Sequence, residues 1–306
     1  SKDDAKCKLA EKWLQKTGVD SELQVKENDT QIHIKGREFA YTIDKRTALF
    51  TEMKFAGREY LNHPMELNIW RAPTDNDMYI KSEWKKAHYD KAYTRAYTTE
   101  VVQGKHGVKI VSHASVVAET VQKILDVTIT WKIDASGKID ADIEATKDGE
   151  FPDLPRFGVR MFLDKKLSAA RYFGMGPQES YCDKHQAASH GLYQANVDDL
   201  HEDYIRPQEN GSHYDCEYVE LNNSRYGIVV SAENAFSFNA SYYTQEELEK
   251  KTHNYELTES DSVVFCVDYA LNGIGSNSCG PVVLDQYRFD DVLFRFQFTL
   301  IPYVKG

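Results

Sequence analysis

The sequence predicts an all-β protein built from antiparallel strands. Short runs of alternating apolar and polar residues follow one another along most of the chain, separated by brief polar or Gly-containing breaks. Helical periodicity is confined to a few short segments, so the alternation of strands and helices that makes a parallel sheet is missing. Many strands without intervening helices favour two large sheets packed face to face as a sandwich.

The individual strands are predicted from their period of two. In residues 293–300 apolar and polar residues alternate throughout, so we expect one face of this strand to be buried and the other solvated. Residues 134–137 (DASG) predict a hairpin turn. The predicted strands are Gln31–Lys35, Phe39–Ile43, Leu49–Phe55, Val108–Val117, Val121–Ile133, Lys138–Thr146, Arg156–Asp164, Tyr214–Asn222, Tyr226–Ala232, Phe236–Tyr243, Ser262–Ala270 and Val292–Pro302.

Helices are expected at few places. Ser82–Asp90 and Thr244–Lys251 have helical character, and the second begins with a capping box, Thr244 followed by Glu247. Residues 5–16 also approach helical spacing. We therefore expect residues 1–20 to be a short helix or the remnant of a linker from a longer polypeptide, and residues 21–306 to be a single β domain.

The composition argues against several classes of partner. The 306 residues carry 48 acidic and 37 basic side chains, a formal net charge of −11. Nucleic-acid binding needs clustered Lys and Arg to displace counterions from phosphates, so no nucleic-acid partner is expected. An anionic membrane surface is disfavoured for the same reason. The longest apolar runs, such as Val263–Val267, are far shorter than a bilayer requires.

Metal and disulfide sites are not expected. The five cysteines are an odd number without a CxxC pair, which indicates free thiols. Asp198–Asp203 is rich in carboxylates that suit a hard cation, but it lacks EF-hand spacing, and a solvated acidic loop is the favoured interpretation. No nucleotide-binding or common hydrolase motif is found, so hydride transfer and phosphoryl transfer lose support.

The most distinctive segment is Trp70–Asp77, which ends an apolar strand and enters a polar loop. One interpretation is a turn that begins at Pro73 and is closed by Asx hydrogen bonds. The other is a polar rim in which Asp75, Asn76 and Asp77 accept hydrogen bonds from sugar hydroxyls or dock a neighbouring domain. The residues favour neither over the other.

A second candidate region is Gly174–Gly211, the longest stretch without strand signals, and a loop of this length is usually functional. It contains Glu179 and Glu209 in similar PQE segments. A retaining glycosidase needs an acid and a nucleophile about 5–5.5 Å apart, which sequence proximity does not establish. A carboxylate that accepts hydrogen bonds from backbone amides in a turn is the commoner role.

Four segments in this order resemble the C-terminal domain of the large β-galactosidases of glycoside hydrolase family two, which some bacteria encode as a small subunit. They are Trp70–Asp77 (WRAPTDND), Tyr172–Tyr181 (YFGMGPQESY), Arg206–Gly211 (RPQENG) and Asn272–Pro281 (NGIGSNSCGP), and the resemblance covers roughly residues 25–304. It implies a galactose-mutarotase-like supersandwich. It also implies that both catalytic glutamates lie on a TIM-barrel domain that this chain lacks.

The resemblance implies a non-catalytic role within a retaining β-galactosidase that acts on terminal β-D-galactosides. The expected partners are the barrel, the other domains and the galactoside, with Mg²⁺ and Na⁺ in the barrel and no cofactor on this chain. A soluble bacterial protein of the cytoplasm or periplasm is expected. Candidate residues for the substrate rim or for domain docking are Arg71, Asp75, Asn76, Asp77, Glu179, Arg206, Glu209, Asn210, Asn277 and Cys279.

The loop Gly275–Pro281 resembles the family loop that reaches toward the galactose site. Several members have a stacking Trp where this sequence has Cys279, and a thiol offers little of the apolar face of an indole. Stacking of the sugar by this chain therefore loses support, and substrate range or affinity is expected to differ.

Two other functions stay open. A free-standing aldose 1-epimerase needs a His and a Glu across a cleft as acid and base. A carbohydrate-binding module would bind galactosides in isolation. The epimerase candidates are His185, His190, His201 and His213, with Glu179 or Glu209.

Overall fold

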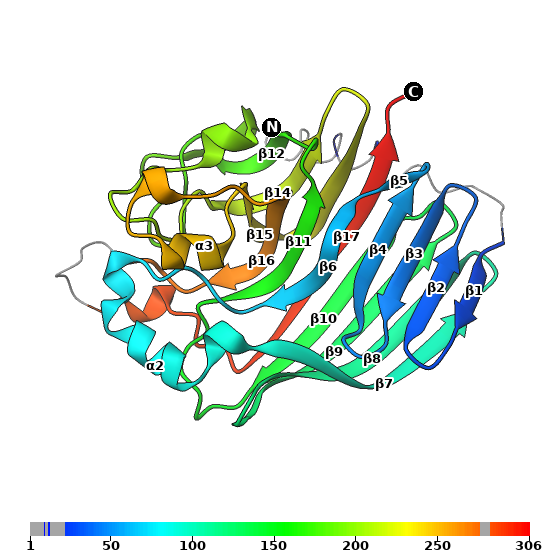
Figure 1. The fold of residues 1–306 in the computed structure, drawn as a ribbon, viewed down its shortest axis with the longest axis horizontal. Coiled ribbons are helices and arrows are strands. Elements are labelled where there is room, and N and C mark those ends of the chain that lie inside the picture. Colours follow the sequence, from blue (N-terminus) through cyan, green and yellow to red (C-terminus); the bar gives the residue numbers. More distant parts are fainter. Residues whose placement is uncertain (1–8, 10–11, 13–21, 276–281) are drawn as a thin grey trace.

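The computed structural model describes residues 9, 12, 22–275 and 282–306 (Figure 1). Apart from residues 9 and 12, the predicted N-terminal helix lies outside this part of the chain. The main elements are β1 (Gln24–Glu27), β2 (Gln31–Lys35), β3 (Phe39–Asp44), β4 (Leu49–Phe55), β5 (Arg58–Glu59), β6 (Leu61–Asn68), α2 (Ile80–Lys86), β7 (Tyr93–Gln103), β8 (Gly107–Ala118), β9 (Val121–Asp134), β10 (Ile139–Lys147), β11 (Arg156–Asp164), β12 (Ala169–Gly176), β13 (Ser189–Asn196), β14 (His213–Asn222), β15 (Tyr226–Ser241), α3 (Gln245–Lys250), β16 (Ser262–Leu271) and β17 (Leu293–Val304).

The strands form two antiparallel sheets, which confirms the predicted all-β class. One sheet has five strands in the order β1-β2-β3-β4-β5, and the other has twelve. In the larger sheet the hydrogen-bonded neighbours follow the order β13-β12-β14-β15-β17-β10-β9-β8-β7. A branch leaves this path at β15, where β16 pairs with β15, β11 with β16, and β6 with β11. The branch arises because residues 226–231 of β15 pair with β17, whereas residues 237–241 pair with β16. Figure 1 shows β1–β4, β6, β11 and β16 lying across β7–β10 and β17.

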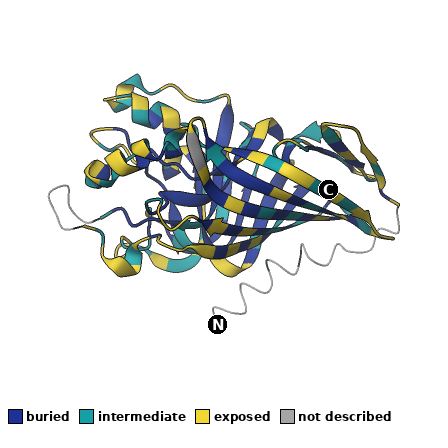
Figure 2. Ribbon diagram, turned by 90° about the horizontal axis from the view of Figure 1, so that it is seen from below, coloured by how far each residue is buried: buried dark blue, intermediate teal, exposed yellow. Residues whose placement is uncertain are grey.

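The core lies between these two layers. The indole Nε1 of Trp131 on β9 donates a hydrogen bond to the carbonyl of Ala48 at 2.8 Å, and the hydroxyl of Tyr41 on β3 donates to the carbonyl of Gly137 at 2.6 Å. The rings of Phe50 and Trp131 meet edge to face with centroids 4.9 Å apart. β10 and β17 alternate buried residues with more exposed ones, a pattern that Figure 2 shows on the larger sheet, and β17 follows the prediction. β11 and β16 are buried along nearly their whole length.

The prediction that Gly174–Gly211 lacks strands is wrong. β12 continues to Gly176, and β13 pairs with it over its full length. β13 is an edge strand without a buried face, so its sequence SHGLYQAN carries no clear alternation. The two strands predicted at Tyr226–Ala232 and Phe236–Tyr243 are one strand, β15, which stays extended through three exposed residues at 233–235.

The two predicted helices are present, but α2 starts at Ile80, two residues before the predicted start, and also ends early. The helix expected at Ser82–Asp90 ends at Lys86, because His88 adopts a left-handed conformation with φ of 58° and the chain continues as a 3₁₀ turn. Half of the predicted capping box is present, since the Thr244 hydroxyl accepts a hydrogen bond from the backbone N–H of Glu247 at 3.1 Å. The Glu247 carboxylate accepts from the backbone N–H of Thr258 at 3.0 Å instead of from Thr244. Within the described residues, neither helix has the length and apolar character needed to cross a membrane.

Candidate functional site

A cleft of about 680 Å³ is formed where the loops of the four sequence motifs meet. Each motif contributes at least one residue to its wall, although the motifs are far apart in the sequence. Polar side chains dominate the lining. The lining residues are Thr74, Asn76, Gln178, Glu179, Asp183, Lys184, His185, Gln186, Ala187, Glu202, Asp203, Tyr204, Gln208, Glu209, Ile274 and Gly275.

Arg71 joins the first motif to the fourth beneath this cleft. Its Nε and Nη2 donate to the carboxylate of Asp77 at 3.1 and 2.7 Å. Its Nη1 and Nη2 donate to the carbonyls of Asn272 and Gly273 at 2.5 and 3.2 Å. Burial opposes the charge on Arg71, but Asp77 outweighs it and raises the Arg71 pKa. Both side chains lie in the interior, where they fix the loops.

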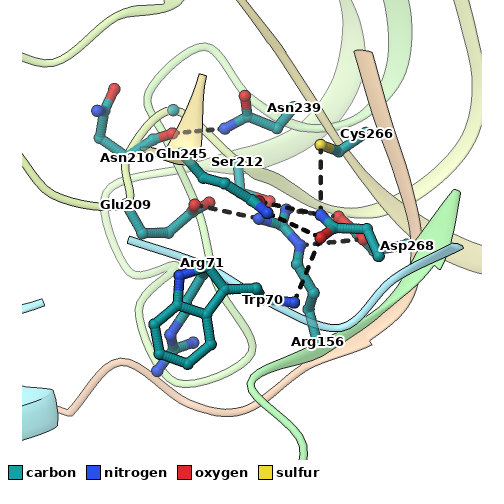
Figure 3. Close-up of polar contacts among 12 residues, drawn as sticks. Trp70, Arg71, Arg156, Glu209, Asn210, Ser212, Asn239, Gln245, Cys266 and Asp268 are labelled. Carbon is teal, nitrogen blue, oxygen red and sulfur yellow. Dashed lines mark hydrogen bonds and ion pairs between the residues drawn. The ribbon is translucent and has the colours of Figure 1, made fainter. Parts of the chain in front are cut away.

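Arg156 at the start of β11 holds the third motif through Glu209 (Figure 3). Its Nε and Nη2 form a bidentate ion pair with Asp268 of β16 at 3.1 and 2.8 Å, and its Nη1 reaches Glu209 at 3.2 Å. Burial raises the pKa of Asp268 to about 6, against the opposing effect of Arg156. Neither Arg156 nor Asp268 was predicted from the sequence as a site residue. The sequence signal that could have indicated Asp268 is an acidic residue inside the otherwise apolar strand β16, SVVFCVDYAL.

Glu179 organises the opposite wall of the cleft. Its carboxylate accepts hydrogen bonds from the backbone N–H of Gly211 at 2.8 Å, from Lys184 Nζ at 2.7 Å, and from the hydroxyl of Tyr204. Burial and then the contact with Glu179 raise the pKa of Tyr204 to about 12. Burial opposes the charge on Lys184, but Glu179 outweighs it and raises the Lys184 pKa. Glu179 thus ties the second motif to the third.

The remaining third-motif residues form a hydrogen-bonded loop. Asn210 is buried, and its side chain accepts from the backbone N–H of Glu202 at 3.0 Å and donates to the carbonyl of Gln208 at 2.9 Å. Gln208 exchanges two hydrogen bonds with Asp75, at 3.1 and 3.2 Å. Asp75 and Arg206 are exposed at the surface. The predicted rim residues are therefore divided between the interior and the rim.

Asp183 anchors the fourth motif. Its carboxylate accepts hydrogen bonds from the backbone N–H groups of Ile274 and Gly275 at 3.1 and 2.8 Å. Asn76 lies against Gly275, because a Cβ at that glycine would stand 3.1 Å from the Cβ of Asn76. The sequence analysis did not select Asp183.

Two predicted residues, Asn277 and Cys279, lie outside the described part of the chain. Among the described residues, no group of three or more His, Cys, Asp or Glu side chains is placed to hold a metal ion, and this includes Asp198–Asp203.

Of the four histidines considered for an epimerase, His185 is the one that lines the cleft together with Glu179 and Glu209. Its Nδ1 lies 3.1 Å from the carbonyl oxygen of Tyr181. The side chain of His213 is buried, which lowers its pKa to about 4. The other two pack against aromatic rings, His190 on Phe173 and His201 on Tyr243.

The fold and the cleft define an all-β sandwich protein with a polar site built by loops at one end. The family model described as beta galactosidase small chain matches residues 35–300. The chain therefore belongs to the β-galactosidase small-chain family.

Two relatives are β-galactosidases. The chain is 45% identical over 281 residues to the enzyme of Actinobacillus pleuropneumoniae and 33% identical over 282 residues to that of Staphylococcus xylosus, with 92% of the chain covered in each case. It spans 28% of the length of both relatives. Among solved structures, a galactose 1-epimerase from Lactobacillus acidophilus NCFM is similar with a TM-score of 0.49 at 9% identity, covering 94% of this chain and 100% of that chain.

Proposed function

We propose that this chain is the C-terminal, non-catalytic part of a retaining β-galactosidase that hydrolyses terminal β-D-galactosides, where it completes the rim of the active site and stabilises the assembly. The observation that carries the proposal is the convergence of all four family motifs on one cleft, in a chain that spans 28% of its β-galactosidase relatives. The barrel would supply both catalytic glutamates and would bind Mg²⁺ and Na⁺.

The hydrogen bonding of the two cleft glutamates supports a structural role for both. Glu209 is paired with Arg156, and Glu179 is paired with Lys184 and a backbone N–H. A retaining glycosidase instead needs two carboxyl groups that face the glycosidic bond, one of them as a proton donor. Here both carboxylates instead form ion pairs and hydrogen bonds with other groups of the chain.

The surface beside the cleft has the character of a docking face. Ile205, next to the lining residue Tyr204, is 95% exposed, and Tyr255 is 84% exposed. Asn254 donates a hydrogen bond to the carbonyl of Tyr204, which brings these two loops together. Exposed apolar side chains grouped around a polar cleft mark interaction sites. We assign this face to the barrel domain of the parent enzyme.

The test is an exchange of segments. The matching 281 residues of the Actinobacillus pleuropneumoniae β-galactosidase are replaced by this chain, and hydrolysis of a chromogenic β-galactoside is measured. We expect the chimera to be active, while the same enzyme without the segment and this chain alone are inactive. Turnover that follows the purified chain through every step, or a folded chimera without activity, would reject the proposal. Catalysed mutarotation of α-D-galactose by the chain alone would favour the epimerase alternative.

A further inference from the structure

A second depression, of about 350 Å³, lies on the other side of the segment that walls the cleft. Tyr181 and Cys182 line this depression, whereas Asp183 and the residues after it line the cleft. The remaining wall comes from the start of β14, the middle of β15, the end of β16, residues 286–289 and Asp291. It is therefore a separate site beside the cleft, and among the described motif residues only Tyr181, at the end of the second motif, lines it.

Irregular strand pairing opens the depression. The register between β14 and β15 shifts between His213 and Cys216 and again between Cys216 and Tyr218. Between these points Asp215 has φ of 54°, a conformation that costs energy for a residue other than Gly. Bulges and strained residues of this kind often redirect side chains at binding sites. Asp215 is thereby placed in the wall of the depression.

Three partly exposed tyrosines supply aromatic surface to the depression, Tyr214, Tyr269 and Tyr287. Tyr269 is fixed by stacking on Phe294, with centroids 5.0 Å apart. Tyr214 stacks on His185 at 5.7 Å. Held rings present an apolar face at little cost in conformational entropy, which suits the C–H face of a sugar ring.

Polar groups without protein partners surround these rings. Within the described part of the chain, the side chains of Asp215, Ser237 and Gln286 make no hydrogen bond, although all three line the depression. The cation of this wall, Arg288, is held by Asp153 at 2.7 Å and by Asp285 at 3.4 Å. The site thus offers donors and acceptors for hydroxyl groups but no free positive charge for a phosphate.

We propose that this depression binds one pyranose ring of a neutral carbohydrate, stacked on Tyr214 and hydrogen-bonded by Asp215 and Gln286. Its volume is at the lower end of the range for small-molecule sites, which fits a monosaccharide unit. Hydroxyl groups both donate and accept, and the unpartnered carboxylate, hydroxyl and amide groups match that requirement. The inference does not depend on the proposed role of the chain in a galactosidase.

The test is a titration of the purified 306-residue chain with methyl β-D-galactopyranoside, methyl β-D-glucopyranoside and methyl α-D-mannopyranoside, followed by saturation-transfer NMR. At least one sugar is expected to bind saturably, with Kd raised tenfold or more by Tyr214→Ala and also by Gln286→Ala. Gln286 is exposed, so its variant keeps the test valid if Tyr214→Ala fails to fold. The matched control is Tyr97→Ala, an exposed tyrosine on β7 that lines neither the depression nor the cleft, which should leave Kd unchanged.

Two results would overturn this inference. One is the absence of saturable binding for all three sugars. The other is binding that survives both depression variants but is lost in the cleft variant Glu179→Gln, which would place the sugar in the cleft. An inactive chimera with intact sugar binding would reject the proposed function and leave this site standing.

Discussion

The carboxylate of Asp183 accepts a hydrogen bond from the backbone N–H of Gly275 at 2.8 Å, at the point where the fourth-motif loop leaves the described part of the chain. Gly275 has φ of 74° and lies against Asn76, so this position needs glycine for both its conformation and its space. The cleft wall and the base of the loop are therefore a single hydrogen-bonded unit. The backbone at Ile274 and Gly275 is thus held by a side chain more than ninety residues away.

This relationship makes Asp183→Ala the first variant to examine in the chimeric enzyme. Hydrogen bonds to charged groups contribute about 1.5–3 kcal/mol each. Because Ile274 and Gly275 line the cleft, water can replace part of each bond, and we expect a loss of unfolding free energy of about 1–2 kcal/mol. Activity should fall by about tenfold or more, because small displacements of positioning groups have large effects on rate. Chromogenic assays and urea unfolding give the two quantities.

Asp285→Ala is the control for this variant, since its carboxylate is 96% exposed. It should leave both activity and stability near those of the parent. Full activity in Asp183→Ala would remove the fourth-motif loop from any role in the rim.

The position of the cleft was largely predictable, because its walls come from the four segments that carry the family resemblance. Asp183 was not selected, because it binds backbone N–H groups and backbone partners leave no mark in a sequence. Arg156 and Asp268 were missed for a related reason. They meet only through the pairing of β11 with β16, and their separation of 112 positions in the sequence hides that contact.

The strands of the core were predicted where one face is buried, as in β9 and β17, because burial imposes the alternation. β13 was missed because an edge strand exposed on both sides has no such constraint. The branch at β15 was not predictable either. It depends on which strands pair with each half of β15, a long-range choice that local patterns do not encode.

The docking face can be tested at Ile205, whose side chain is 95% exposed in the isolated chain. Ile205→Asp should leave the stability of the chain within about 0.5 kcal/mol, because nothing is buried there. In the chimeric enzyme it should lower the thermal stability and the activity, since a charge would be placed in an apolar interface. Differential scanning calorimetry and the chromogenic assay measure these effects.

The matched substitution is Leu293→Asp, on a side chain 73% exposed at the start of β17. It should change neither quantity in the chimera. Equal behaviour of the two variants would mean that Ile205 faces solvent in the assembly, and the docking face would have to be sought elsewhere.

The buried ion pair of Arg156 with Asp268 predicts a large effect on stability. Arg156→Met leaves the carboxylates of Asp268 and Glu209 buried without their cation, and breaking such a pair costs about 3–5 kcal/mol of unfolding free energy. Urea unfolding of the isolated chain measures this loss. Arg295→Met is the comparison, because Arg295 pairs with Asp142 in an exposed position, where a loss below about 1 kcal/mol is expected. Similar losses in both variants would show that burial does not strengthen the Arg156 pair.

His213 predicts a dependence of stability on pH. Burial lowers its pKa to about 4 in the folded chain, against a usual value near 6.5, although the hydrogen bond to the carbonyl of Met175 and then the charge of Glu179 act in the opposite direction. Between pH 4 and pH 6.5 the unfolded chain binds a proton at His213 more readily than the folded chain does. The contribution of neutral His213 to the free energy of unfolding is therefore complete above about pH 6.5 and is lost as the pH falls toward 4. The full difference corresponds to roughly 3 kcal/mol.

The measurement must separate this contribution from that of Asp268, whose pKa is raised to about 6 and whose effect has the opposite sign over the acidic range. The variant His213→Asn removes the titration while its amide can donate to the carbonyl of Met175, the present partner of Nδ1 at 3.0 Å. Urea unfolding at pH 4.5 and pH 7.5 should show a smaller loss on acidification in His213→Asn than in the parent chain. His253→Asn, at a half-exposed histidine, should behave as the parent. An unchanged pH dependence in His213→Asn would mean that this histidine accepts a proton in the folded chain as readily as in the unfolded one.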